Sequence, residues 1–217
     1  MLSRMLRAGA LALLMSSITS LLSSEAQASV LADLSVEDRS VGATFIIEGE
    51  VQTIWTEMDE KGRIWTRARV RVDDQLKGED LPGEVVVDSM GGRFGDYSLT
   101  VVGQAVFSQG EKVFLFLDEV QNGSRLVPLG KFLGKYTIRR APGETRHHVL
   151  NWHARGGAST FDHRFIPHPS PTRRFYLSDL RQTVAETLET GWMGQEIPGL
   201  SPVQLEQRNT AARRRVQ

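Results

Sequence analysis

The residues with the most evident capacity for chemistry are the five histidines, which all lie between positions 147 and 168. Imidazole is a common zinc ligand, and a zinc site needs three or four ligands that converge on one ion. We treat His147, His148, His153 and His163 as a candidate metal site. Their spacings match no zinc-binding motif, and the nearby prolines and glycines indicate loop. A solvent-exposed histidine cluster without metal is therefore the simpler interpretation.

A second candidate site combines tryptophan and arginine in the first half of the chain. Its members are Trp55, Trp65, Arg67 and Arg69, with Arg71 continuing the series. An indole ring can stack on a sugar or a peptide, and arginines at every second position line one face of a strand. The alternatives are core packing of the tryptophans and a solvated arginine face. The carboxylates of Glu48 and Glu50 on the neighbouring strand would balance such a face.

A glycine-rich stretch at residues 91–97 contains Arg93. It lacks the lysine and the serine or threonine of a phosphate-binding loop, so it predicts a flexible connection between strands. Such a connection could contact a ligand at the rim of a barrel. We therefore add Arg93 to the candidate ligand-binding residues.

The sequence contains none of the familiar catalytic signatures. A nucleophile elbow, a zinc-binding helix motif, a P-loop, a dinucleotide-binding glycine pattern and an EF-hand loop are all absent. The chain has no cysteine, which excludes disulfides, thiolate nucleophiles and iron–sulfur clusters. Its 26 basic side chains balance 26 acidic ones, which disfavours binding to nucleic acid. We expect no cofactor and a function that is not enzymatic.

The N-terminus predicts export. Arg4 and Arg7 precede an apolar stretch at 8–22, and Ala26 and Ala28 form an A-x-A cleavage site, so we expect residues 1–28 to be a signal peptide. Serine and threonine interrupt the apolar stretch, which is shorter than the ~20 apolar residues that span a bilayer. No later stretch is long enough to cross a membrane. Export without cysteine indicates a bacterial periplasmic or secreted protein.

Residues 29–140 predict a β domain. Polar and apolar residues alternate over 45–55 and again over 64–72, which is typical of two half-buried strands that form a hairpin. Apolar runs at 84–88 and 112–117 predict further strands. Six or seven short strands without intervening helices favour a mainly β fold, a small antiparallel OB-like barrel or sandwich.

The C-terminal part has a different composition. We expect a histidine- and proline-containing extension at 141–176, one amphipathic helix at 177–191 and a disordered tail at 192–217. The apolar face of the helix consists of Leu177, Leu180, Val184 and Leu188. Ser178 is the expected N-cap, and Gly191 suits the C-terminal end. Packing of this helix on the barrel is favoured over docking on a partner.

Four segments of the β domain carry a resemblance to a known family. They are 46–51, 68–78, 83–87 and 109–117. In this order they resemble bacterial exported proteins that are in turn similar to netrin-like (tissue inhibitor of metalloproteinases) OB-barrel domains. The resemblance covers residues 41–120 and implies an OB-like barrel with a binding role, without catalytic residues. The inhibitors reach a protease metal with an N-terminal cysteine, which this chain lacks, so metalloprotease inhibition is not implied.

These observations predict an exported, non-catalytic binding or assembly module. Its partner would be a protein, peptide or glycan of the cell envelope, with no nucleic acid and no stable membrane span after cleavage. One alternative is a metal-dependent hydrolase that uses the histidine-rich segment 147–168. Another is a structural component of the cell envelope whose helix at 177–190 docks on another subunit.

Overall fold

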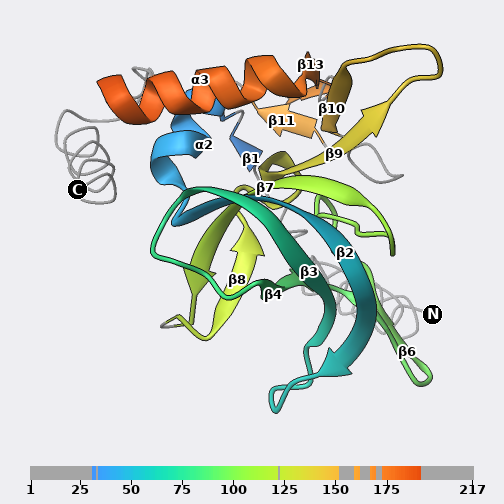
Figure 1. Ribbon diagram of the computed structural model, residues 1–217. Coiled ribbons are helices and arrows are strands. Elements are labelled where there is room, and N and C mark those ends of the chain that lie inside the picture. The colour runs from blue at the N-terminus through green and yellow to red at the C-terminus, as the bar shows by residue number, and fades with distance from the viewer. Residues whose placement is uncertain are drawn as a thin grey trace, which may run out of the picture.

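The structure is a computed structural model that describes residues 31–32, 34–121, 123–151, 159–161, 167–169 and 173–191 (Figure 1). The predicted signal peptide and the predicted C-terminal tail lie outside these residues. Among the described helices, none combines the length and the apolar character that a membrane crossing requires.

A closed ring of five strands forms the centre of the molecule (Figure 1). Its strands are β2 (Phe45–Met58), β3 (Ile64–Lys77), β4 (Glu84–Met90), β7 (Lys112–Val120) and β8 (Arg125–Pro128). The order around the ring is β7-β2-β3-β4-β8, and β8 pairs back with β7. This arrangement confirms the predicted mainly β fold built around a small barrel.

One pair of strands in the ring departs from the predicted antiparallel sheet. Strands β4 and β8 are parallel, with Val87 opposite Leu126, whereas the other four neighbouring pairs are antiparallel. A ring with an odd number of strands cannot alternate direction throughout, so closing five strands requires at least one parallel pair. Closure gives every strand of the ring a neighbour on both sides over at least part of its length.

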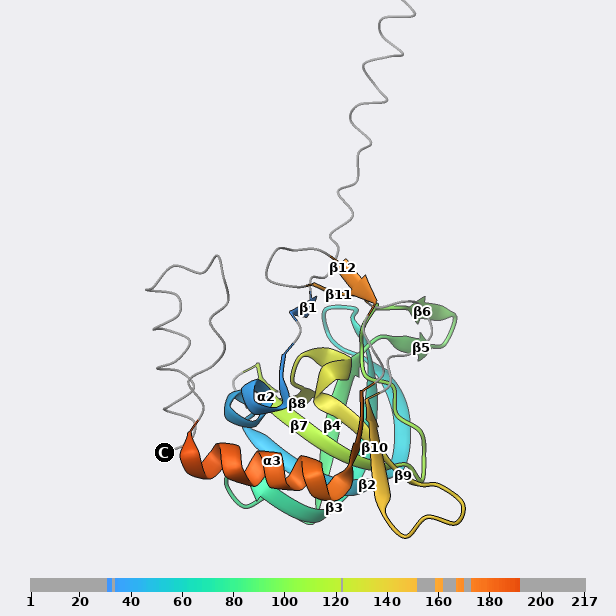
Figure 2. The same cartoon turned by 90° about the horizontal axis from the view of Figure 1, so that it is seen from above.

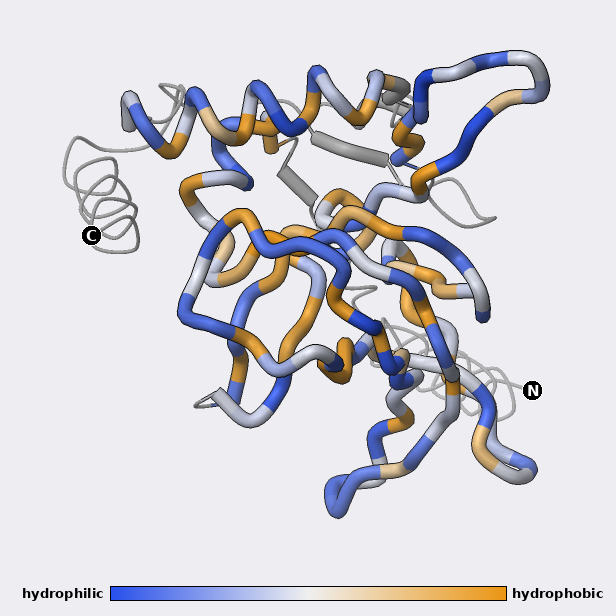
Figure 3. Tube along the Cα trace, viewed as in Figure 1, coloured by the Kyte–Doolittle hydropathy of each residue, from blue (hydrophilic) through white to orange (hydrophobic). Residues whose placement is uncertain are grey.

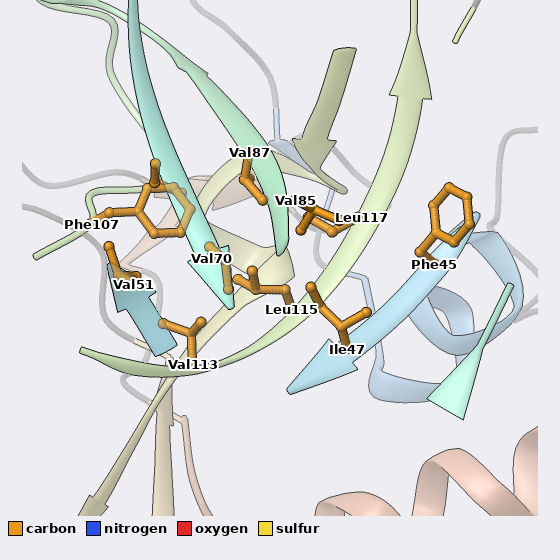
Figure 4. Close-up of a cluster of buried hydrophobic side chains, with 12 residues drawn as sticks. Phe45, Ile47, Val51, Val70, Val85, Val87, Phe107, Val113, Leu115 and Leu117 are labelled. Carbon is orange, nitrogen blue, oxygen red and sulfur yellow. The ribbon is translucent and has the colours of Figure 1, made fainter. Parts of the chain in front are cut away.

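Apolar side chains at alternate positions fill the barrel (Figure 4). Labelled members of this core are Phe45, Ile47, Val51, Val70, Val85, Val87, Phe107, Val113, Leu115 and Leu117. The β2–β3 register shifts between Val51 and Thr53, and this irregularity turns Ile54 toward the same core. Gly49 allows close approach of the two strands, because a Cβ atom there would lie 2.2 Å from the carbonyl oxygen of Arg71.

The sheet continues beyond the ring through strands that pair on the other side of β7. They are β9 (Lys135–Arg140), β10 (His147–Asn151) and β13 (Arg173–Tyr176). The expectation of loop around the histidines at 147–168 is therefore wrong for β10, and the extension predicted at 141–176 also contains β13. Val149 of β10 is fully buried in a hydrophobic cluster, and Phe175 of β13 packs against that cluster. Burial therefore stabilises both strands, although the prolines and glycines around them are more typical of loops.

Helix α3 (Leu177–Thr190) lies across this extended sheet and confirms the predicted C-terminal helix (Figures 1 and 2). Its Leu180 and Val184 are buried in a second core with Phe116 and Tyr136, so the favoured interpretation, packing on the barrel, is confirmed. Hydrophobic and hydrophilic residues alternate along the helix in Figure 3. Ser178 is not the N-cap, because Tyr176 precedes the helix and provides no side-chain cap.

Helix α2 (Val36–Gly42), which is not predicted from the sequence, packs beside α3. Ser35 caps this helix through a reciprocal hydrogen-bonded pair with Asp38. Arg39 is fully buried, donates a hydrogen bond to the Tyr136 hydroxyl at 2.8 Å and lies over the Phe116 ring. Seven residues are too few for a clear helical period in the sequence.

The remaining elements are short. They are β1 (Leu31–Ala32), β5 (Gly92–Phe94), β6 (Tyr97–Leu99), η2 (Lys131–Gly134), β11 (Ser159–Phe161) and β12 (Pro167–Pro169). Strands β5 and β6 form a hairpin within the glycine-rich stretch, on the opposite side of the barrel from α3 (Figures 1 and 2). Residues 100–107, which follow β6, contain no helix or strand.

Candidate functional site

The histidines of the candidate metal site are not assembled in the described part of the chain. His147 and His148 are neighbours on β10; His147 is exposed and His148 is buried. The His148 ring contacts the Glu144 carboxylate and lies 4.7 Å from the Tyr176 ring centroid. Within the described residues, no three His, Asp or Glu side chains are placed to hold a metal ion. His153 and His163 lie outside those residues, so the four-histidine site stays a prediction.

Four of the five predicted ligand-binding residues share the outer face of the barrel. Trp55 on β2 is opposite Arg67 on β3, which is opposite Asp88 on β4. Trp65 and Arg69 flank Arg67 on the same side of β3, because side chains alternate along a strand. We call Trp55, Trp65, Arg67 and Arg69 the tryptophan–arginine face. Arg93 lies apart from them, on β5.

The two tryptophans of this face differ in accessibility. Trp65 is only 5% exposed, donates a hydrogen bond from Nε1 to Asp59 at 3.0 Å and lies 4.6 Å below the Arg125 guanidinium. The packing interpretation therefore holds for Trp65. Trp55 is partly exposed, and the guanidinium groups of Arg67 and Arg69 lie 5.6 and 5.7 Å from its ring centroid. Trp55 is the tryptophan that a ligand can reach.

Carboxylates hold the arginines of the face in fixed positions. Arg67 Nε donates to Asp88 at 2.9 Å, and Arg125 donates to the other Asp88 oxygen at 2.6 Å. The Asp88 side chain is 1% exposed. Burial lowers the pKa of Arg67, but hydrogen bonds to Glu57 and Asp88 outweigh it and raise the pKa above its ordinary value. The Arg67 guanidinium is therefore always charged.

The prediction that Glu48 and Glu50 balance the charge of these arginines is correct for Glu50 only. Arg71 donates to Glu50 at 3.2 Å across the strands, as expected. Glu48 instead forms a two-point ion pair with Arg181 of helix α3, with one hydrogen bond of 2.7 Å. Glu48 is buried between the barrel and the helix, so it does not belong to the tryptophan–arginine face.

The β2–β3 turn next to this face is organised by Asp59. Its carboxylate accepts hydrogen bonds from the backbone N–H groups of Lys61 and Arg63, from Arg63 Nε and from Trp65 Nε1. Desolvation alone would raise the pKa of Asp59, but these hydrogen bonds hold it well below its ordinary value. The turn is thus fixed relative to Trp65.

Sequence reasoning missed a cavity of about 360 Å³ beside the end of β4, between the β5–β6 hairpin and residues 100–107. Phe107 and Ala105 line it and also belong to the barrel core, so its floor is continuous with that core. Every described residue that lines the cavity is uncharged. The sequence contains one indication of this cavity, a mostly apolar segment at 99–107 that belongs to none of the five ring strands.

Four exposed large apolar side chains of the described residues belong to the two segments that line this cavity. They are Phe94, Tyr97, Val102 and Val106, and their exposed fractions lie between 43% and 68%. Val102 and Val106 line the cavity directly. Phe94 and Tyr97 form a cross-strand pair of the β5–β6 hairpin, which contributes one wall. We call these four residues the mouth patch.

A buried ionic cluster supports the floor of the cavity. Lys135 Nζ lies 5.4 Å from the Phe107 ring centroid and donates to Glu111 at 2.6 Å. Thr137 donates to the same Glu111 oxygen, and Ser108 N–H donates to the other at 3.1 Å. Burial lowers the pKa of Lys135 against the opposing effect of Glu111. The cluster anchors the chain that follows Phe107.

Comparison with known proteins identifies no family for this chain, because no protein-family model and no curated protein matches it.

Proposed function

We propose that this protein is an exported, non-catalytic binding module that holds an extended, uncharged polypeptide segment at the mouth patch. The observation that carries the proposal is an uncharged cavity that is lined by exposed Val102 and Val106 and by the β5–β6 hairpin, which carries exposed Phe94 and Tyr97. Contiguous exposed apolar surface in a soluble protein is typical of an interaction site. The predicted signal peptide and the absence of catalytic motifs support the export and the lack of catalysis.

The chemistry of the cavity supports a polypeptide partner. An uncharged lining offers nothing to offset the desolvation of a charged ligand, whereas it favours burial of apolar side chains. Tyr97 is the most exposed of the four residues, and tyrosine is enriched among residues that dominate binding energy.

The backbone beside the cavity supports an extended conformation of that partner. Within the described part of the chain, the backbone groups of Val102, Val106 and Phe107 form no hydrogen bond. An extended peptide could pair with such groups while its alternate side chains enter the cavity. The resemblance to netrin-like barrels, which implies a binding role, agrees with this proposal.

The experiment is a selection from a phage-displayed library of random peptides on the purified chain. We expect enrichment of peptides with alternating apolar residues and without charge in the contact segment. Replacing Tyr97→Ser or Val106→Ser should weaken the selected peptide by about 10- to 30-fold, which corresponds to roughly 1.4–2 kcal/mol. Val120→Ser, on β7, is the matched control and should leave binding unchanged. Failure to enrich any peptide, or equal binding by all three variants, would overturn the proposal.

A further inference from the structure

We infer a second binding site, independent of the mouth patch, in which the tryptophan–arginine face binds a neutral oligosaccharide. The site is centred on Trp55, with Arg67, Arg69 and Glu57 around it. The inference rests on three features of the structure: the open position of Trp55, the fixed polar groups beside it and the charge balance of the face.

Trp55 lies where β2 has a strand on one side only. The pairing of β2 with β7 extends from Phe45 to Glu50, whereas its pairing with β3 continues to Met58. The two arginines that contact the indole both belong to β3. On the side away from β3, no described strand pairs with β2 at Trp55; β5 contacts β2 one residue further on, where the Thr56 hydroxyl donates to the Arg93 carbonyl oxygen at 2.6 Å. An indole with an open side offers an apolar surface for the C–H groups of a sugar ring.

The polar groups beside Trp55 are held in place before a ligand arrives. Buried Asp88 orients Arg67, and both oxygens of Glu57 accept from Arg67 Nη1 at 3.0 Å. Within the described residues, the Nη2 donor of Arg67 has no hydrogen-bond partner. The Glu57 side chain is 34% exposed and the Arg69 side chain 49% exposed. The site thus presents donors and acceptors within one small area, and sugar hydroxyl groups both donate and accept.

The charge balance of the face selects a neutral ligand. Its ion pairs join Arg63, Arg67, Arg69, Arg71 and Arg125 to Glu50, Glu57, Asp59, Asp73, Glu84 and Asp88. Among the described residues, five guanidinium groups against six carboxylates leave a net charge of about −1, so the arginines create no positive field. A polyanion such as nucleic acid or an acidic polysaccharide would not be attracted. Paired arginine and carboxylate groups are instead suited to ligands rich in hydroxyl groups.

The test uses an array of neutral and acidic oligosaccharides probed with the labelled full chain. We expect binding to at least one neutral oligosaccharide, with an affinity that changes less than twofold between 50 and 500 mM salt, about the range over which ionic contacts are screened. Binding should also change the intrinsic tryptophan fluorescence. No binding on the array, or salt-sensitive binding to acidic oligosaccharides alone, would overturn the inference.

Single substitutions test which residues form the oligosaccharide site. Trp55→Ala should weaken binding by about 10-fold or more, because it removes the apolar surface on which the sugar ring would pack. Arg69→Gln, a half-exposed position, should weaken binding several-fold and provides a test if Trp55→Ala fails to fold. Arg140→Gln, at an exposed position of β9 outside the face, is the matched control, and Tyr97→Ser tests independence from the mouth patch; neither should affect oligosaccharide binding. Unchanged binding by a folded Trp55→Ala and by Arg69→Gln would refute the site.

Discussion

Replacement of Asp88 by asparagine tests the ionic network of the barrel wall. The Asp88 side chain is 1% exposed and accepts one short hydrogen bond from Arg67 and one from Arg125, at 2.9 and 2.6 Å. Asparagine has almost the same shape, so Asp88→Asn removes the charge without opening a cavity. Two guanidinium groups, 25% and 13% exposed, then lose their common partner.

The expected loss of stability follows from these contacts. Breaking a buried ion pair costs about 3–5 kcal/mol, and a hydrogen bond to a charged group contributes about 1.5–3 kcal/mol. Arg67 keeps its hydrogen bonds to Glu57, and the amide oxygen of asparagine can still accept a hydrogen bond. We therefore expect Asp88→Asn to lower the free energy of unfolding by about 3 kcal/mol. For a chain of this size the melting temperature should fall by roughly 6–12 °C.

Urea denaturation followed by circular dichroism measures this difference. Asp73→Asn is the matched control, because the Asp73 carboxylate pairs with Arg71 while both side chains are at least 39% exposed. Exposed pairs contribute about 0–1 kcal/mol, so the control should unfold close to the unmodified chain. A change below about 0.5 kcal/mol in Asp88→Asn, or equal effects of both substitutions, would refute the reasoning.

Three further predictions concern the second core beneath α3, the close approach of β2 and β3 at Gly49, and the β2–β3 turn. Leu180→Ala should destabilise the chain by roughly 2–5 kcal/mol in thermal unfolding, because Leu180 is 1% exposed between α3 and the sheet; a loss below about 1 kcal/mol would contradict this packing. Gly49→Ala should destabilise by more than the ~1 kcal/mol of an average substitution, since its Cβ would meet the backbone of Arg71, and an unchanged denaturation midpoint would show that the strands can separate. The lowered pKa of Asp59 implies a stabilisation that is complete above the ordinary value of 3.8 and is lost as the pH falls below it. Unfolding of Asp59→Asn measured from pH 6 to pH 2 should lack this part of the acid-induced loss, and identical profiles for both chains would oppose the role given to Asp59.

The parts of the fold that the sequence predicts are those with a clear local period. Alternation over 64–72 correctly separates Ala68 and Val70, which face the core, from Arg67 and Arg69, which face outward. The helix at 177–190 is also periodic, and Gly191 ends it with a positive φ of 75°. These features depend on neighbouring residues alone.

The parts that the sequence does not predict depend on contacts between distant residues. Strand β10 is stabilised by burial of Val149 beneath α3, which no local pattern reveals. Glu48 pairs with Arg181, a partner 133 positions away, rather than with the neighbouring strand. The mouth patch combines the β5–β6 hairpin with Val102 and Val106 of the following segment. Such a surface exists only once the barrel has closed.

The most direct test of the central claim is amide chemical-shift mapping of the isotope-labelled full chain during titration with the peptide selected from the phage library. The proposed function predicts that the largest shift changes fall on Phe94, Tyr97, Val102 and Val106, with none on helix α3. Changes centred on α3 or on the β7–β8 turn, or no change at saturating peptide, would contradict a partner site at the mouth of the barrel.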